Sequence, residues 1–412
     1  METRTGTVGL RTVLAGLAVL MHIWLAPIAT AADTASATRA AISGDQYRTT
    51  FELDLTAGVT AEIYTLANPY RVIVDLPDVT FRLPESTGQE SKGLVQAFRF
   101  GLFAERKARV VVDTTGPVRI ERAAMTAKRN GIAFTFDMVT TDPASFGLGT
   151  GADKAAASAP KPPDTDSTAL VKPKRSGKPV IMIDPGHGGI DAGAISSSNV
   201  FEKNVVLAVG KELGRQLAAT GRYEVQMTRA TDVFISLDQR VGLSLTHGVD
   251  LFISLHADSL AEQSVAQTIR GATIYTLSER ASDEQARRMA EKENASDLVA
   301  GLNVADGEGG DEVKSILIDL MKRETANFSA DFSNVLVRKL KTATSLSRAP
   351  QRAAAFKVLK QTHAPSVLIE LGYLSNPEDE KLLNSADWHK KMAASITTAV
   401  DTYFAKRTAV SP

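Results

Sequence analysis

The 412-residue chain contains no cysteine, so no disulfide can hold it together. A chain without disulfides depends on its hydrophobic core, and this one is long enough to bury apolar surface in two domains. Lysine and arginine together number 47, as do aspartate and glutamate, which leaves a formal net charge of zero. This balance gives no support for nucleic-acid binding, which requires a basic bias.

Long apolar runs are also missing beyond the N-terminus. A membrane-spanning helix needs about 20 apolar residues in succession, and no segment after residue 32 reaches that length. Within 1–32, Arg4 and Arg11 precede the apolar stretch 13–25, and the small residues Ala29-Thr30-Ala31 follow it. This order predicts a cleaved secretory signal peptide and a soluble mature chain, with a retained membrane anchor as the alternative.

Composition divides the mature chain in two. Residues 142–177 are rich in glycine, alanine, serine and proline, which predicts a flexible linker. Before it, apolar and polar residues alternate, as at Phe51, Leu53 and Leu55. This alternation predicts a small all-β, sandwich-like domain over residues 33–141. Because this segment has no histidine and no catalytic cluster, we interpret it as a binding or spacer module.

A short repeat occurs within the β-rich segment. RVIVDLPD at 71–78 is echoed by RVVVDTTGP at 109–117. The echo indicates either two related strand units packed face to face or merely a composition that is common in strands. The sequence leaves both interpretations open.

Residues 178–408 alternate strand-like and helix-like segments, which predicts an α/β domain with a mainly parallel twisted sheet flanked by helices. Apolar residues at helical spacing predict a helix over 202–218. Ligands of such sheets bind at the carboxyl ends of strands. The predicted strands cover 178–184, 223–229, 250–256, 271–277 and 365–371.

Three of these strands end in a reactive side chain. Glu370 lies in the apolar run SVLIELG, His187 in DPGHGG and His256 in SLHAD. A buried carboxylate costs several kcal/mol unless it is paired or functional. The alternatives to a functional cluster are a turn histidine at His187 and a buried ion pair of Glu370 with Arg229 or Arg240.

Glu202 begins the predicted helix at 202–218, where a carboxylate can simply interact with the helix dipole. The preceding loop is short enough to fold Glu202 back toward His187, and His256 provides a third candidate ligand from a neighbouring strand. Two imidazoles and one carboxylate suit a catalytic zinc, which keeps a fourth position open for water.

The motifs DPGHGGIDAGA, Glu202-Lys203, LFISLHAD and SVLIELGYLSNPEDE resemble the zinc-dependent N-acetylmuramoyl-L-alanine amidases of the type 3 family over residues 179–407. Among them the chain looks like the periplasmic cell-division amidases of Gram-negative bacteria, whose N-terminal AMIN domain the β-rich segment resembles. The resemblance implies that the enzyme cuts the amide bond between N-acetylmuramic acid and L-alanine in peptidoglycan. It also implies a periplasmic protein that is recruited to the division septum and splits the wall between daughter cells.

The resemblance implies a role for each site residue. His187, Glu202 and His256 correspond to the ligands of a Zn²⁺ cofactor, and Glu370 corresponds to the catalytic carboxylate. Two other function classes remain open from the residues alone. One is a zinc carboxypeptidase that acts on stem peptides, and the other is a non-catalytic wall-binding module.

The connection between the strands at 271–277 and 365–371 is much longer than a sheet crossover requires. The resemblance implies a regulatory helical insert, about 279–348, that covers the site and offers a glutamate to the zinc. We choose Glu291, with Glu293 as the alternative. A periplasmic activator with a LytM-like domain is expected to dock on the insert near 316–321, unless that helix face only packs on the core.

Overall fold

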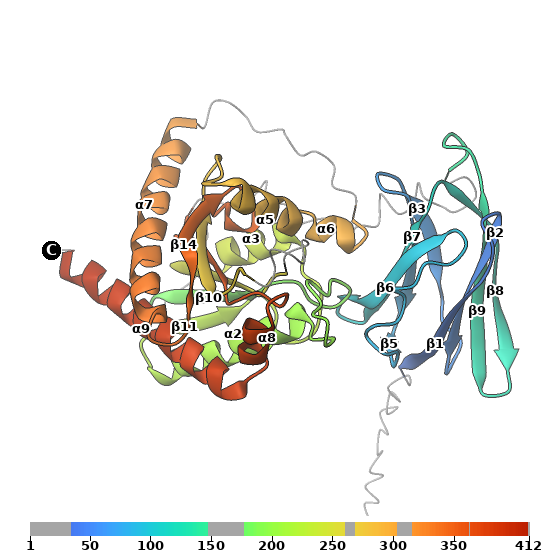
Figure 1. The fold of residues 1–412 in the computed structure, drawn as a ribbon, viewed down its shortest axis with the longest axis horizontal. Coiled ribbons are helices and arrows are strands. Elements are labelled where there is room, and N and C mark those ends of the chain that lie inside the picture. Colours follow the sequence, from blue (N-terminus) through green and yellow to red (C-terminus); the bar gives the residue numbers. More distant parts are fainter. Residues whose placement is uncertain (1–33, 147–176, 260–267, 303–314, 362, 411–412) are drawn as a thin grey trace, which may run out of the picture. The chain divides into compact units, whose positions relative to one another are not determined.

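The computed structural model describes residues 34–146, 177–259, 268–302, 315–361 and 363–410 (Figure 1). The predicted signal peptide and most of the predicted linker lie outside these ranges. No helix within them combines the length and the apolar character that crossing a membrane requires.

The β-rich segment forms two sheets that share one core, which confirms the sandwich-like prediction. Phe51 of one sheet packs edge-on against Phe98 of the other, with ring centroids 5.1 Å apart. The five-stranded sheet has the order β5 (Val79–Phe81), β1 (Ala35–Gly44), β2 (Arg48–Leu55), β9 (Gly131–Thr140) and β8 (Val118–Lys128). The four-stranded sheet has the order β3 (Glu62–Leu66), β4 (Arg71–Pro77), β7 (Lys107–Thr114) and β6 (Val95–Ala104).

The two echoing segments are strands β4 and β7, which are neighbours in one sheet. They pair antiparallel, with Arg71 opposite Asp113. The face-to-face arrangement suggested by the echo is therefore wrong. Val72 and Val74 of β4 face the sandwich core, whereas Ile73 belongs to a second apolar cluster on the opposite face of the sheet.

The C-terminal sheet confirms the mainly parallel α/β prediction. Its strand order is β11 (Glu224–Met227), β10 (Val180–Pro185), β12 (Leu251–His256), β15 (Ser366–Glu370), β13 (Ala272–Leu277) and β14 (Leu346–Ala354). The first four strands are parallel, and β13 runs antiparallel to β15. Strand β14 was not predicted.

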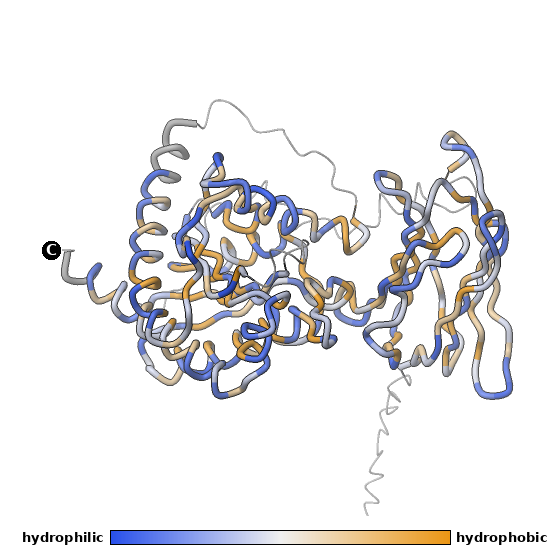
Figure 2. Tube along the Cα trace, viewed as in Figure 1, coloured by the Kyte–Doolittle hydropathy of each residue, from blue (hydrophilic) through white to orange (hydrophobic). Residues whose placement is uncertain are grey.

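Helices cover both faces of this sheet, whose strands are strongly apolar (Figure 2). One face packs against α2 (Glu202–Ala219), α7 (Ser315–Leu340) and α9 (Ala386–Val410). The other face packs against α3 (Leu237–Thr246), α5 (Glu284–Asn294) and the 3₁₀ turn η3 (Lys357–Leu359). Two short helices, α6 (Ser296–Val299) and α8 (Pro377–Leu383), complete the domain.

The long connection contains α5, α6 and α7. The C-terminal half of α7 belongs to the core through the buried residues Phe332, Leu336 and Leu340. Its N-terminal residues near 316–321, predicted to dock an activator, have side chains outside the described part of the structure. That docking site stays a prediction.

Candidate active site

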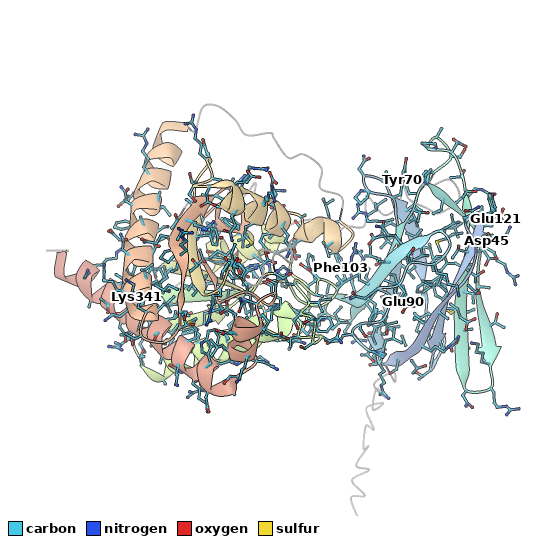
Figure 3. All side chains as sticks on the ribbon, in the orientation of Figure 1. Asp45, Tyr70, Glu90, Phe103, Glu121 and Lys341 are labelled. Carbon is cyan, nitrogen blue, oxygen red and sulfur yellow. The ribbon has the colours of Figure 1, made fainter. Side chains whose placement is uncertain are left out.

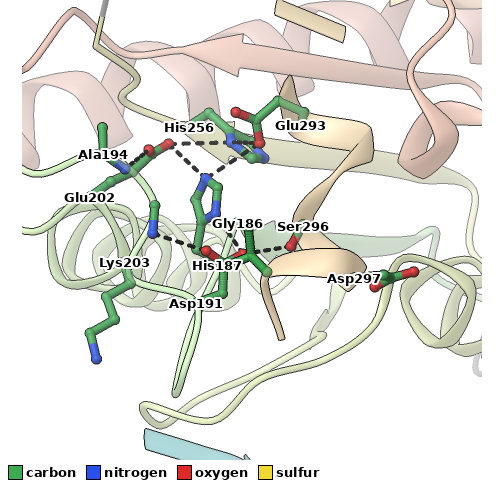
Figure 4. Close-up of polar contacts among 12 residues, drawn as sticks. Gly186, His187, Asp191, Ala194, Glu202, Lys203, His256, Glu293, Ser296 and Asp297 are labelled. Carbon is green, nitrogen blue, oxygen red and sulfur yellow. Dashed lines mark hydrogen bonds and ion pairs between the residues drawn. The ribbon is translucent and has the colours of Figure 1, made fainter. Parts of the chain in front are cut away.

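The sheet brings the predicted reactive side chains to one edge, and Figure 4 shows His187, Glu202 and His256 together there. His256 and Glu370 are the last residues of the adjacent parallel strands β12 and β15, and they are direct partners in the register. His187 follows the end of β10 by two residues. Parallel strands end at the same edge of a sheet, so three separate sequence motifs meet there.

The loop that carries His187 is tightly constrained. His187 has a φ of 56°, in the left-handed region that residues other than glycine rarely adopt. A Cβ atom at Gly186 would lie 2.5 Å from Cε1 of the His256 ring, so only glycine fits there. The two imidazole rings lie with their centroids 4.9 Å apart.

His187 is oriented by a buried carboxylate that the sequence reasoning missed. Nδ1 of His187 lies 2.9 Å from Oδ2 of Asp191, and with Nδ1 protonated it donates to that oxygen. Nε2 is then left as an acceptor, and it is buried without a hydrogen-bond partner among the described residues. Such carboxylate–histidine pairs orient metal ligands. The four-residue spacing within DPGHGGIDAGA could have revealed Asp191.

Glu202 is fully buried and is held by two backbone amides. Oε2 accepts from the Ala194 amide and Oε1 from the Ala257 amide, both at 2.8 Å. Oε1 also lies 3.2 Å from Nε2 of His187 and 3.3 Å from Nδ1 of His256. The carboxylate thus points into the histidine cluster, as expected from the short loop that precedes Glu202.

A second carboxylate, Glu293 on α5, approaches the same two nitrogens. Its Oε2 lies 3.3 Å from Nε2 of His187 and 3.0 Å from Nδ1 of His256. Glu291 is elsewhere: its side chain is 60% exposed and pairs with Arg287. The choice of Glu291 is therefore corrected to the alternative, Glu293.

The helical periodicity of α5 explains this correction. The buried residues Ala286, Met289, Ala290 and Glu293 recur at the three- and four-residue spacing of one helix face. Glu291 does not lie on that face. The apolar residues of this face, unlike the charged ones, predict from the sequence that Glu293 and not Glu291 points inward.

The four side chains form a candidate metal site whose dimensions fit zinc. Ligand atoms of His187, His256 and Glu293 all lie within 4.8 Å of one another. The nitrogen–oxygen separations of 3.0–3.3 Å resemble the spacing of about 3.3 Å between neighbouring ligands of tetrahedral zinc bound at about 2.0 Å. Two imidazoles with carboxylates also form a donor set that zinc accepts.

Electrostatics agree with a cation at this position. Burial opposes protonation of His256, yet the carboxylates of Glu293 and Glu202 raise its pKa to about 10. The cluster therefore attracts positive charge to the point between the imidazoles and the carboxylates.

Glu370 lies beside the metal cluster, with one oxygen unoccupied. Its Oε2 accepts from the Asp258 amide at 3.1 Å, and its buried Oε1 has no hydrogen-bond partner among the described residues. Burial raises the pKa of this carboxyl well above its usual range. A carboxyl that burial makes easier to protonate, with one oxygen free, suits acid–base catalysis.

The ion pair considered for Glu370 does not form. Arg240 donates instead to Asp184 at 2.6 Å. Arg229 donates to the carbonyl oxygens of Pro185 and Gly186 at 2.9 and 2.8 Å. Both arginines therefore support the loop that carries His187.

Helix α5 makes a second ionic contact near the site. Lys292, next to Glu293, pairs with Asp258, which follows His256 by two residues. Asp258 is buried, and burial raises its pKa to about 6. Sequence reasoning did not single out Asp258 or Lys292, although Asp258 closes the SLHAD motif.

Comparison with known protein families identifies the chain. The family described as N-acetylmuramoyl-L-alanine amidase (Amidase_3) matches residues 181–402. The chain belongs to this amidase family. The AMIN domain matches residues 41–136 of the β-rich segment. The protein is therefore an N-acetylmuramoyl-L-alanine amidase (EC 3.5.1.28) that acts on peptidoglycan, not a carboxypeptidase or a non-catalytic module.

Two curated relatives show how far the similarity extends. The chain is 38% identical over 232 residues to N-acetylmuramoyl-L-alanine amidase AmiA of Escherichia coli K12, covering 56% of this chain and 78% of that protein. It is 31% identical over 398 residues to AmiC of Neisseria meningitidis serogroup B, covering 92% of this chain and 93% of that protein. This second match spans both domains.

Among solved structures, the catalytic domain of CwlV, an amidase from Bacillus (Paenibacillus) polymyxa var. colistinus, is 25% identical. The match covers 55% of this chain and 98% of that domain, with a TM-score of 0.40.

Proposed function

We propose that this amidase uses zinc held by His187, Glu202 and His256, and that Glu293 blocks the metal in the resting state. The observation that carries the proposal is the position of Glu293 Oε2, 3.0 and 3.3 Å from the two free imidazole nitrogens. A carboxylate there occupies the position that an attacking water needs.

Zinc would supply Lewis-acid chemistry, lowering the pKa of a coordinated water to about 7 and polarising a carbonyl. Glu370 takes the proton from the attacking water and gives it to the amine of L-alanine as the amide bond breaks. The Asp258 amide holds one oxygen of Glu370, which leaves the other free for this proton. Asp191 fixes the ring of His187 so that Nε2 faces the metal position.

Release of the restraint requires α5 to leave the site. This is a two-state equilibrium, which a partner can shift only by binding the open state more tightly than the closed one. We assign that role to a periplasmic activator with a LytM-like domain that docks on the insert. The amphipathic helix α7, which belongs to the same long connection as α5, supports this assignment.

The AMIN domain and the predicted signal peptide support a periplasmic location at the division septum, where the enzyme would separate daughter cells. The AMIN domain has its own core and no catalytic cluster among its described residues, which suits a targeting role. We further propose the boundaries 33–141, 142–177 and 178–408 for the targeting domain, the linker and the catalytic domain.

The test uses the zinc-loaded mature chain and purified peptidoglycan without a partner protein. Glu293→Gln should raise hydrolysis at least tenfold, because a neutral amide is a poor ligand. Glu291→Gln, on the exposed face of the same helix, is the matched control and should match the wild type. Released peptides should begin with a free L-alanine. Equal rates for all three proteins would overturn autoinhibition, and a metal-free active enzyme would overturn the zinc assignment.

A further inference from the structure

The four-stranded sheet of the AMIN domain has a second buried face that its own sandwich core does not explain. On this face, Ile73 of β4 and Val111 of β7 are fully buried, and Arg71 and Arg109 are only 1% and 4% exposed. Buried guanidinium groups need hydrogen-bond partners, because desolvating an unpaired charge is costly. Asp75 and the Pro69 carbonyl supply some of these partners from within the AMIN domain, and the others lie outside it.

The partners outside the AMIN domain are four consecutive backbone carbonyls at the end of α6. Arg71 donates to Leu298 O at 2.5 Å, and Arg99 donates to Val299 O at 2.7 Å. Arg109 donates to Ala300 O and Gly301 O at 3.0 and 3.3 Å. Leu298 O also accepts from the Gly301 amide, but the last carbonyls of a helix have few donors within it, so the arginines supply donors to this helix end.

Two of the arginines are also held in position by carboxylates of the AMIN domain. Asp113 holds Arg99 through two contacts of 2.6 and 3.0 Å. Asp75 holds Arg109 at 2.6 and 2.8 Å, and the guanidinium also lies 3.5 Å from the ring centroid of Phe103, labelled in Figure 3. Preorganised guanidinium groups lose little side-chain entropy when they bind a further acceptor.

Apolar packing surrounds these hydrogen bonds. Ala300 is fully buried in the cluster that contains Ile73 and Val111. Gly301 has a φ of +74°, and a Cβ atom there would lie 2.7 Å from Cδ1 of Ile73. Phe103 of the AMIN domain stacks on Phe234 of the catalytic domain, with centroids 5.8 Å apart. The α6 end is therefore fitted closely to the sheet.

The same segment is coupled to the active site. Leu298 follows Glu293 by only five residues, and the Ser296 hydroxyl donates to Asp191, the carboxylate that orients His187. Helix α5 cannot move far from the metal position unless α6 moves with it. Such movement would break the arginine–carbonyl contacts.

We propose that the AMIN domain is an intramolecular clamp that holds the α5–α6 segment, and with it Glu293, on the active site. This proposal rests on the proposed autoinhibition by Glu293 and adds a second restraint outside the catalytic domain. The AMIN domain is then a regulator as well as a targeting module, and a ligand that displaces Arg71, Arg99 and Arg109 from α6 favours the active state.

The experiment compares basal hydrolysis of purified peptidoglycan by the zinc-loaded mature chain and its variants. The double variant Arg71→Met, Arg99→Met keeps the apolar stems and removes two charged donors. We expect about a tenfold rise, corresponding to about 1.4 kcal/mol. Arg106→Met is the matched control, because Arg106 is an exposed arginine of the same domain that pairs with Asp78. It should leave the rate unchanged.

Two further measurements make the outcome decisive. Hydrogen exchange of amides at 284–302 should be faster in the double variant. Gly301→Ala disturbs the interface from the α6 side with an unaltered AMIN sequence, so it should raise both rates even if the arginine variant does not fold. If the variants fold but hydrolyse peptidoglycan and exchange amides at wild-type rates, the clamp is overturned.

Glu293→Gln, measured in parallel, separates failure of the clamp from failure of autoinhibition. If only Glu293→Gln raises hydrolysis and exchange is unchanged in the interface variants, the clamp is wrong and autoinhibition stands. If exchange accelerates in the interface variants but no variant raises hydrolysis, the clamp stands and autoinhibition by Glu293 is wrong.

Discussion

At the scale of single residues, the site separates metal binding from proton transfer. His187→Ala removes a ligand and should abolish both zinc content and activity. Glu370→Gln should retain zinc but lose at least a hundredfold in kcat, since acid–base groups contribute about 10²–10⁴ to the rate. Metal analysis and peptidoglycan hydrolysis on the same samples measure both. Stoichiometric zinc in the His187 variant contradicts the ligand assignment.

The buried contacts of Asp184 predict an effect on the stability of the fold and on its pH dependence. Its carboxylate accepts from Arg240 at 2.6 Å and from the hydroxyls of Thr228 and Ser254, both at 2.7 Å. Asp184→Ala leaves Arg240 buried without its charge partner, so the free energy of unfolding should fall by about 3–5 kcal/mol. Asp387→Ala, an exposed surface control, should change it by less than about 0.5 kcal/mol.

The pH dependence follows from the direction of the shift. Burial raises the pKa of Asp184, but the contacts with Arg240, Thr228 and Ser254 together lower it by more. The folded-state pKa therefore lies below the usual value. The stabilisation is therefore present above the unfolded-state pKa of about 3.9 and is lost as the pH falls through the lower folded-state value. Urea unfolding at pH 7 and pH 3 should show a smaller difference between variant and wild type at pH 3.

Glu293 shows what the residue pattern could and could not predict. The strand-end positions of His187, His256 and Glu370 could be predicted, because apolar runs mark strands and parallel strands end together. The choice between Glu291 and Glu293 depended on which side of α5 faces the site. The apolar residues Ala286, Met289 and Ala290 mark that side, whereas the charged residues alone do not.

At the scale of elements, α5 is held on the site by a second charge contact. Lys292→Met should remove its pairing with Asp258 and raise basal hydrolysis several-fold, because the closed state loses a partly buried ion pair. Arg288→Met, on the exposed side of α5 where Arg288 pairs with Glu284, should not. Activity assays without a partner protein distinguish them, and equal rates for both variants exclude a restraining role of Lys292.

Strand β14 lies in the long connection and was not predicted. Its sequence LSRAPQRAA is polar and contains a proline, which suits an edge strand but not the apolar pattern used to find strands. Since the C-terminal half of α7 belongs to the core, deleting 279–348 would remove a structural element together with the restraint. Point substitutions in α5 are therefore the better test.

At the scale of the whole molecule, the AMIN domain and the catalytic domain have separate cores. Deleting 33–170 should leave a folded catalytic domain that binds zinc and no longer concentrates at the septum. Because the clamp is also lost, its basal activity should exceed that of the full chain. Fluorescence microscopy and hydrolysis assays test both outcomes, and septal localisation of the deletion variant would contradict the targeting role.

The arginine–carbonyl contacts between these domains could not be predicted from sequence. Arg71, Arg99 and Arg109 bind backbone oxygens, which every residue carries, so no residue type at the receiving end marks the interface. The fold of each domain follows from local patterns. Their mutual contact depends on the shape and position of one helix end.

The position of Glu293 between two ligand imidazoles has a thermodynamic consequence. If the glutamate helps to hold zinc in the closed state, the closed state binds the metal more tightly than the open one. By reciprocity, whatever opens the helix weakens zinc affinity by the same factor. An active amidase should therefore give up its zinc at a lower chelator concentration than a resting one, so that activation also makes each molecule more prone to lose the metal on which its activity depends.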